Sequence, residues 1–188
     1  MLCMNEENID FIFNPVFENL ISLSLDQNGL CVIKKLIIKI QGHEKRLLIG
    51  ERLSNNAVQL VQSPYGNYAV QQALDNWPIG YCKKMFDNLE PHLLQLSVQK
   101  FSSNVIEKVL ENAETDVVGR YAKHLTEHEV MKSLIKNSYG YYVMQKLTSI
   151  LKKHKLPTKK VQQAIEGTLC YVSDKSLKQK WVNLLNSA

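Results

Sequence analysis

A repeat of about 37 residues runs through the chain and constrains its fold more than any other feature. Four segments align without gaps on one small residue, and the intervals between these residues are 37, 36 and 38: Gly29, Gly66, Ser102 and Gly140. A leucine lies six positions before each small residue, at Leu23, Leu60, Leu96 and Leu134. A period of this length is typical of solenoids, in which each repeat buries its apolar face against its neighbours.

Apolar residues recur at helical spacing on both sides of each small residue. The stripe that begins at Val32 and Ile33 and continues at Leu36 is one example. This pattern predicts four middle helices over about 28–40, 66–76, 102–113 and 140–153. A short helix should precede each one, and a third helix should follow near 43–53, 79–89, 115–125 and 158–169. Since no window shows sustained strand alternation, we expect an all-α solenoid of three-helix repeats.

The repeat register also predicts how the chain is organised. We expect a single repeat domain over residues 1–188, with repeats at about 15–53, 54–90, 91–126 and 127–170. The amphipathic tail over 171–188, which includes Trp181 and Leu184, predicts a capping helix at the C-terminal end. Residues 1–14 are the candidate for the opposite cap.

Composition narrows the classes of function. The formal net charge of +5 favours anionic partners. No apolar run approaches the ~20 residues of a membrane span, and the polar first ten residues differ from a secretory signal. We therefore expect a cytoplasmic protein, or a nuclear or nucleolar one, with no membrane partner. The scattered cysteines are expected to be free thiols, although spacing alone leaves a disulfide open: Cys3, Cys31, Cys82 and Cys170.

Polar and aromatic side chains recur on the face of each middle helix that lies opposite its apolar stripe. At ~100° per residue, Asn67, Gln71 and Tyr68 lie at about 0°, 40° and 100°, whereas the stripe lies between about 240° and 300°. Positions one, two and five after each small residue therefore form a trio. The four trios are Leu30, Cys31 and Lys34; Asn67, Tyr68 and Gln71; Ser103, Asn104 and Glu107; and Tyr141, Tyr142 and Gln145.

The residue types in these trios suit the recognition of nucleic-acid bases. An amide pair can meet the donor and acceptor edge of uracil, and a carboxylate can accept from the two N–H groups of guanine. A tyrosine ring offers a face for stacking. Solvated polar positions are common on any helix, but a trio that recurs in register with the core favours a functional surface.

Three segments resemble the repeats of the Pumilio (PUF) family of RNA-binding proteins. They are Gly-Asn-Tyr-Ala-Val-Gln-Gln at 66–72, Ser-Ser-Asn-Val-Ile-Glu-Lys at 102–108 and Gly-Tyr-Tyr-Val-Met-Gln-Lys at 140–146. The resemblance covers about 15–170, and the order of trios is similar to the last four of the family's usual eight repeats plus the cap. It implies one base per repeat, with positions one and five on the base edge and position two stacking. It also implies that the RNA runs antiparallel to the protein.

On this resemblance, the second and third repeats have recognisable preferences. Asn67 and Gln71 would recognise uracil while Tyr68 stacks. Ser103 and Glu107 would recognise guanine, with Asn104 at the stacking position.

The two outer repeats depart from the family pattern. In the fourth, Tyr141 replaces the usual asparagine, although Tyr142 and Gln145 fit a uracil site. In the first, Leu30 and Lys34 match no common pair. The implied target is single-stranded RNA with a 5′-UGU-3′ core and one unassigned 3′ base. The resemblance further implies regulation of messenger RNA through 3′ untranslated regions, with repressor or deadenylase proteins as partners.

Other functions suit parts of the sequence. A protein-binding solenoid of the armadillo or HEAT kind would have a similar core but would not require these trios. Some PUF-like proteins bind structured RNA in ribosome assembly, which the intact second and third trios disfavour.

A zinc-protease pattern is also present. The segment His124-Leu-Thr-Glu-His128 matches H-x-x-E-H, but the repeat register puts a helix junction between its histidines. No phosphate-binding, dinucleotide-binding or G-x-S-x-G motif occurs. We therefore expect neither an enzyme nor a bound cofactor.

Overall fold

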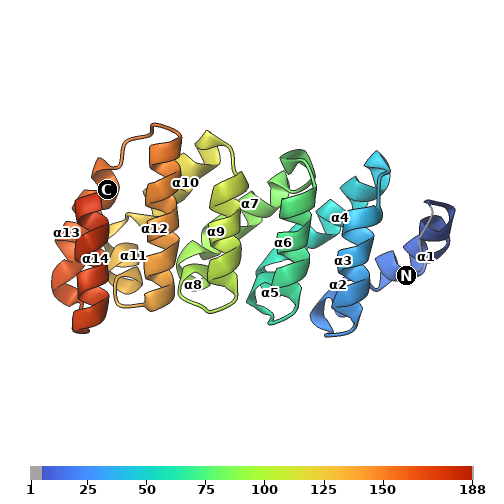
Figure 1. Ribbon diagram of the computed structural model, residues 1–188, viewed down its shortest axis with the longest axis horizontal. Coiled ribbons are helices and arrows are strands. Elements are labelled where there is room, and N and C mark those ends of the chain that lie inside the picture. The colour runs from blue at the N-terminus through green and yellow to red at the C-terminus, as the bar shows by residue number, and fades with distance from the viewer. Residues whose placement is uncertain (1–5, 188) are drawn as a thin grey trace. The chain divides into compact units, whose positions relative to one another are not determined.

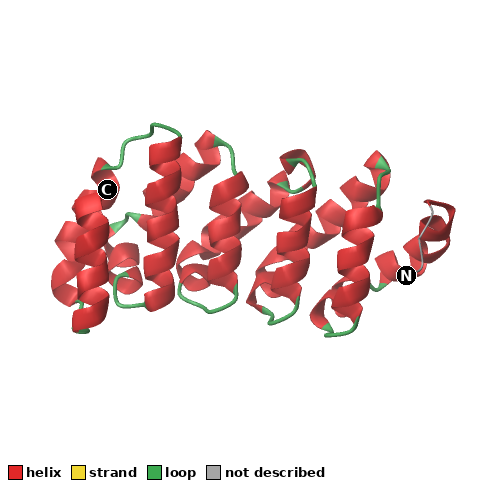
Figure 2. Ribbon diagram, in the orientation of Figure 1, coloured by secondary structure: helices red, strands yellow, loops and turns green. Residues whose placement is uncertain are grey.

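The computed structural model describes residues 6–187, and every regular element within that range is a helix (Figure 2). The predicted all-α class is therefore confirmed. The chain divides into two compact units between Pro91 and His92. Each unit contains two of the repeats. Within the described range, no helix is both long and apolar enough to cross a membrane.

The first unit holds repeats one and two. Its helices are α1 (Glu6–Glu18), α2 (Leu20–Leu25), α3 (Gly29–Lys39), α4 (His43–Asn55), α5 (Ala57–Gln62), α6 (Gly66–Asn76) and α7 (Lys83–Leu89), with a 3-10 turn, η1, at Ile79–Tyr81. The middle helices α3 and α6 lie side by side, and α4 packs against α7 (Figure 1). Ile33, Leu53 and Val70 are among the fully buried side chains between these helices.

The second unit holds repeats three and four and the cap. It contains α8 (Leu93–Ser97), α9 (Ser102–Asn112), α10 (Thr115–Leu125), α11 (His128–Leu134), α12 (Ser138–Lys153), α13 (Lys159–Thr168) and α14 (Lys175–Ser187), with the 3-10 turn η3 at Leu169–Tyr171. The 3-10 turn η2 (Glu90–His92) includes the boundary between the units. The middle helices α9 and α12 lie side by side, and α14 packs against α12 and α13 (Figure 1).

These bounds agree with the predicted repeat helices to within about two residues, with one exception, and the C-terminal cap helix begins at Lys175, four residues after the start of the predicted 171–188 cap. The third helix of repeat two is divided into η1 and α7, and its first turn contains Gly80, a poor helix former. The candidate cap at 1–14 is partly outside the described residues, because nothing is described before Glu6. Its described part belongs to α1, which extends to Glu18.

The small residue at the start of each middle helix is required by a backbone contact. A Cβ atom added to Gly29, Gly66 or Gly140 would lie 2.5, 2.7 or 2.6 Å from a carbonyl oxygen. That oxygen belongs in each case to the leucine six positions earlier. In the third repeat, Ser102 turns this proximity into a hydrogen bond, since its Oγ donates to the carbonyl of Leu96 at 2.7 Å. The small residue therefore recurs once per repeat because, at that position, the middle helix lies too close to the preceding short helix for most side chains.

Replacing Gly140 with alanine should lower the free energy of unfolding by about 1–3 kcal/mol, because the new methyl group would press on the Leu134 backbone. Urea titration followed by circular dichroism would measure the change. Gly119→Ala is the matched control. Gly119 lies within α10 with no atom near its added Cβ, so alanine should stabilise the helix by about 0.5–1 kcal/mol. Equal effects of the two substitutions would contradict the proposed backbone contact.

Each unit contains one tryptophan whose indole N–H donates to a backbone carbonyl near the C-terminal end of another helix. In the first unit, Trp77 Nε1 donates to the carbonyl of Ile37 at 2.9 Å. In the second, Trp181 of α14 is fully buried and donates to the carbonyl of Ile135 at 2.9 Å. The capping helix predicted from the sequence is therefore present and attached to repeat four through its tryptophan.

The described cysteines carry free thiols, in agreement with the prediction. Cys31 and Cys170 are exposed, whereas burial raises the pKa of the Cys82 thiol to about 12. Cys3 lies outside the described residues.

Candidate RNA-binding site

All four trios lie at the start of the middle helices α3, α6, α9 and α12, but their members differ in exposure. Position two is exposed in every repeat, and position five is half-buried or exposed. Position one is buried in every repeat, with exposed fractions of 8%, 1%, 2% and 8%: Leu30, Asn67, Ser103 and Tyr141. The sequence placed all three positions on one surface arc, so the prediction was wrong about the exposure of position one.

Asn67, at position one of repeat two, makes hydrogen bonds to the turn before α6 and to the next turn of α6. Asn67 Nδ2 donates to the carbonyl of Ser63 at 2.7 Å. Because a carbonyl oxygen can only accept, this bond fixes which way the Asn67 amide faces. Its Oδ1 then accepts from Gln71 Nε2 at 2.9 Å. The two amides therefore form an ordered pair, and Asn67 sets the orientation of Gln71.

This ordered pair keeps the groups needed for a base. Gln71 retains one N–H of Nε2 as a donor and both lone pairs of Oε1 as acceptors. A donor beside an acceptor is complementary to the N3–H of uracil and the carbonyl next to it. Tyr68 is 51% exposed on the same helix and offers a ring face for stacking.

The third trio combines a buried hydroxyl with a half-buried carboxyl group. Ser103 Oγ lies 3.5 Å from the carbonyl of Lys100, and Asn104 Nδ2 donates to the same carbonyl at 3.3 Å. Burial raises the pKa of Glu107 above its usual value of 4.5, and the positive charge of Lys146 partly opposes this rise. A desolvated carboxylate at this position can accept from two adjacent N–H donors more strongly than one in water.

An ion-pair cluster lies one turn further along α9. Glu111 pairs with Lys146 of α12 and with Lys108, the latter at 3.2 Å. The hydrogen bond from Lys146 is the main reason that the pKa of Glu111 is lowered. Lys146 is thereby held on Glu111, which connects the middle helices of repeats three and four beside Glu107.

The fourth trio is dominated by aromatic contacts. The Tyr141 ring meets the Trp181 ring edge-on at 5.2 Å and the Tyr142 ring at 5.4 Å. Tyr141 is therefore held by packing, whereas Tyr142 and Gln145 are exposed. A neighbour of this trio, Lys180 of α14, was not predicted from the sequence. Its Nζ lies near both tyrosine rings. No signal in the sequence relates residue 180 to residues 141 and 142, because only the packing of the cap joins them.

The first trio has little that could recognise a base edge. Leu30 is buried as part of the core, and Cys31 and Lys34 are exposed and half-buried, respectively. This arrangement agrees with the absence of a common recognition pair in the sequence.

The H-x-x-E-H segment is divided between two helices, as the register predicted. His124 belongs to the last turn of α10 and His128 begins α11, so the two histidines do not share one helical face. Within residues 6–187, no group of three potential metal ligands comes together.

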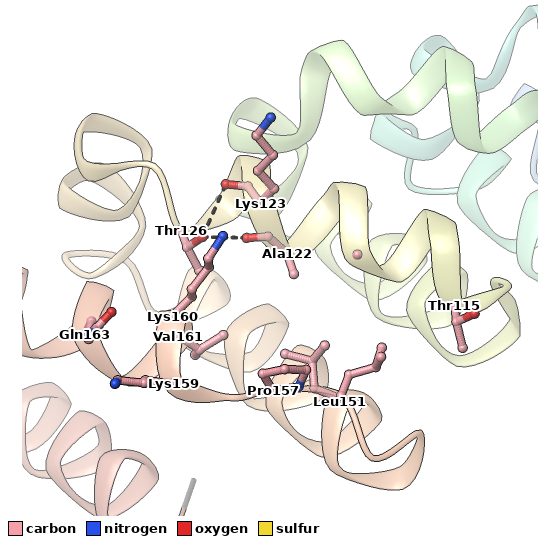
Figure 3. Close-up of a pocket in the computed structure, with 12 residues that line it drawn as sticks. Thr115, Ala122, Lys123, Thr126, Leu151, Pro157, Lys159, Lys160, Val161 and Gln163 are labelled. Atoms are coloured by element: carbon pink, nitrogen blue, oxygen red, sulfur yellow. Dashed lines mark hydrogen bonds between the residues drawn. The ribbon is translucent and has the colours of Figure 1, made fainter.

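A pocket of about 590 Å³ lies among α10, α12 and α13 of the second unit (Figure 3). Thr126 on its wall donates to the carbonyl of Ala122 at 2.7 Å. Apolar side chains and lysines line it, including Leu151, Val161 and Lys160. No trio residue lines this pocket, so it is separate from the candidate RNA-binding site.

Comparisons with known proteins agree with the predicted repeat. The model of the Pumilio-family RNA binding repeat matches residues 19–51, 56–90, 92–118 and 132–147. The chain therefore belongs to the Pumilio family. It is 31% identical over 150 residues to the putative pumilio homolog 8, chloroplastic, of Arabidopsis thaliana, covering 80% of this chain and 29% of the relative. It is also 31% identical over 135 residues to Pumilio homolog 12 of the same plant, covering 72% and 22%.

Solved structures of the family share the fold. The Puf4 RNA binding domain bound to the HO endonuclease RNA 3′ UTR recognition sequence matches with a TM-score of 0.80 and 19% identity. The match covers 97% of this chain and 55% of that one. The RNA-binding domain of yeast Puf5p bound to SMX2 RNA matches with a TM-score of 0.81 and 17% identity, covering 97% and 51%. The chain thus spans less than a third of these curated relatives and about half of the solved domains.

Proposed function

We propose that this chain binds single-stranded RNA through its four trios, one base per repeat, and prefers a 5′-UGU-3′ core. The ordered amide pair of Asn67 and Gln71 is the observation that carries the proposal. The pair holds the Gln71 amide in one direction, which suits a base edge that presents a donor beside an acceptor. The base order follows from the antiparallel orientation that the family resemblance implies. The carboxyl group of Glu107 would take the central guanine.

The proposed role is regulation of messenger RNA through 3′ untranslated regions, with repressor or deadenylase proteins as partners. The structurally similar Puf4 RNA binding domain binds a 3′ UTR recognition sequence, which supports this role. The alternative function was a solenoid that binds protein. Because the chain belongs to a family of RNA-binding repeats, RNA binding is favoured over that alternative.

Direct binding measurements test the proposal. Fluorescence anisotropy with a labelled UGU-containing oligonucleotide should show binding well short of nanomolar affinity. Three or four stacked bases, at about 1–3 kcal/mol each, must offset the cost of association. An oligonucleotide with ACA in place of UGU should bind more weakly at the same salt concentration. Equal affinity for the two RNAs would overturn the proposed base preference, and binding to neither would overturn the function.

The fixed amide of Gln71 should make repeat two distinguish uracil from cytosine. Cytosine N3 is an acceptor where uracil has the N3–H donor, so cytosine would face Gln71 Oε1 with like polarity. A free glutamine could turn its amide over to suit cytosine, but the bond to Asn67 Oδ1 prevents this turn. Leaving one buried polar group unpaired costs about 1–3 kcal/mol.

Replacing Asn67 with alanine should therefore reduce the uracil-over-cytosine preference at the 3′ position of UGU by about tenfold, because Gln71 becomes free to turn. Competition between oligonucleotides that differ only at this base would measure the ratio. The preference for guanine at the central position is the internal control and should persist, because Glu107 is unchanged. An unaltered uracil-to-cytosine ratio would show that Asn67 does not orient Gln71 during binding.

A further inference from the structure

Lys180, on the capping helix α14, lies beside both aromatic side chains of the fourth trio. Its Nζ is 5.8 Å from the centroid of the Tyr141 ring and 5.5 Å from that of Tyr142. Tyr142 is 43% exposed, and Lys180 is exposed as well. A cation therefore lies next to the ring on which the proposed function places a stacked base.

The position of this lysine is fixed by its neighbour in the chain. Trp181 is fully buried, donates to the carbonyl of Ile135 and packs edge-on against Tyr141. Because Lys180 immediately precedes Trp181, its backbone is held by the packing that attaches the cap to repeat four. The Lys180 side chain therefore extends from a fixed backbone position, and its Nζ lies beside the two tyrosine rings.

The chemistry of this cation suits an anionic ligand. A lysine ammonium has three N–H donors. An aromatic ring attracts the positive charge but does not use all three donors in hydrogen bonds, so donors stay available for an acceptor. Residues 175–187 include Lys175, Lys178 and Lys180 and no acidic residue. The surroundings on α14 therefore favour an anion over competing carboxylates.

We propose that Lys180 contacts RNA by binding the phosphate of the nucleotide whose base stacks on Tyr142. This inference rests on the proposed function and adds the capping helix to the RNA-binding surface. A lysine acts as a point charge on phosphate and does not distinguish bases. Lys180 therefore contributes affinity and salt dependence at the 5′ end of the bound element, and it leaves base preference to the trios.

The salt dependence of binding tests this inference. Each phosphate contact on a single strand contributes about 0.7 to the slope of log K against log salt concentration. Lys180→Gln should reduce the slope by about 0.7 and weaken binding at low salt by several-fold, equally for RNAs that differ in their bases. Lys180→Arg should keep the wild-type slope, because it keeps the positive charge.

Lys178→Gln is the matched control. It removes the same charge from an exposed position on α14, but two residues correspond to about 200° around the helix. It should change the slope much less than Lys180→Gln does. Thermal unfolding of each variant checks that the cap remains folded.

The outcomes separate the two proposals. If the wild-type chain binds UGU RNA and Lys180→Gln has the wild-type slope, the phosphate contact is wrong and the proposed function stands. Equal slopes for the two glutamine variants would likewise overturn the contact, because the effect would then come from net charge. If the wild-type chain binds no UGU RNA, both proposals fail together.

Discussion

Replacing Ser103 with asparagine and Glu107 with glutamine should shift the preferred central base of UGU from guanine to uracil. The double change copies the Asn67 and Gln71 pair of repeat two onto α9. Guanine presents two adjacent N–H donors to a carboxylate, whereas uracil presents an acceptor that the carboxylate would repel. A polar mismatch in a desolvated site costs about 1–3 kcal/mol. The ratio of guanine to uracil affinity should therefore be roughly tenfold to hundredfold lower in the double variant, enough for uracil to become the preferred base.

Competition between UGU and UUU oligonucleotides at one salt concentration measures this exchange. Glu129→Gln is the control, since it removes one carboxylate from an exposed side chain of the same unit. It should leave the preference for guanine intact. If the double variant still prefers guanine by the wild-type ratio, Glu107 does not recognise the central base.

The same variant should also change the pH dependence of binding. Guanine requires the ionised carboxylate, and burial raises the pKa of Glu107 above 4.5. Affinity of the wild-type chain for UGU should therefore fall as the pH is lowered through that pKa, and should be fully present above it. The double variant has no carboxylate at this position and should lose this component of the pH dependence.

Replacing Trp181 with alanine should destabilise the second unit by about 3–5 kcal/mol, the typical cost of removing a buried tryptophan. The change removes the most deeply buried side chain of α14 and leaves the Ile135 carbonyl without its indole donor. It also removes the ring against which Tyr141 packs. We expect a lower urea midpoint and weaker binding at the 5′ uracil of UGU.

Far-UV circular dichroism would follow the helices of both units, while fluorescence from the remaining tryptophan, Trp77, would follow the first unit alone. A transition seen by circular dichroism but not by fluorescence would then belong to the second unit. Trp181→Phe is an intermediate variant that keeps an aromatic ring but loses the N–H donor. Its loss of stability should lie between those of the wild-type chain and the alanine variant. A loss below about 1 kcal/mol for alanine would mean that α14 is attached by other contacts.

The helices could be predicted well from the sequence because their positions follow from a pattern of residues that lie close together in the chain. The leucine six positions before each small residue, such as Leu60 before Gly66, corresponds to the contact between two successive helices. Local spacing determines this geometry, so it is visible in one sequence. The trio positions follow from the same register, which is why the candidate site could be proposed from the residues alone.

The features that the sequence did not predict depend on contacts between distant residues. A helical wheel gives the direction of Tyr141 but not the presence of Trp181, which is 40 positions later and fills the space beside it. The proximity of Lys180 to Tyr142 depends on the same packing. The burial of Asn67 was missed for a different reason. A wheel treats side chains as radial vectors, whereas this amide folds back onto the carbonyl of Ser63.

The burial of position one limits how the specificity of such a chain can evolve. A substitution at Ser103 or Asn67 alters packing as well as the base edge, because both side chains are almost inaccessible to solvent. Many single substitutions that change the recognised base would therefore lower stability before a new preference is gained. Duplication or exchange of whole repeats avoids this obstacle, since each repeat transfers its buried residue together with the backbone that accommodates it. New target sequences should accordingly arise more readily by rearranging repeats than by accumulating point mutations within one.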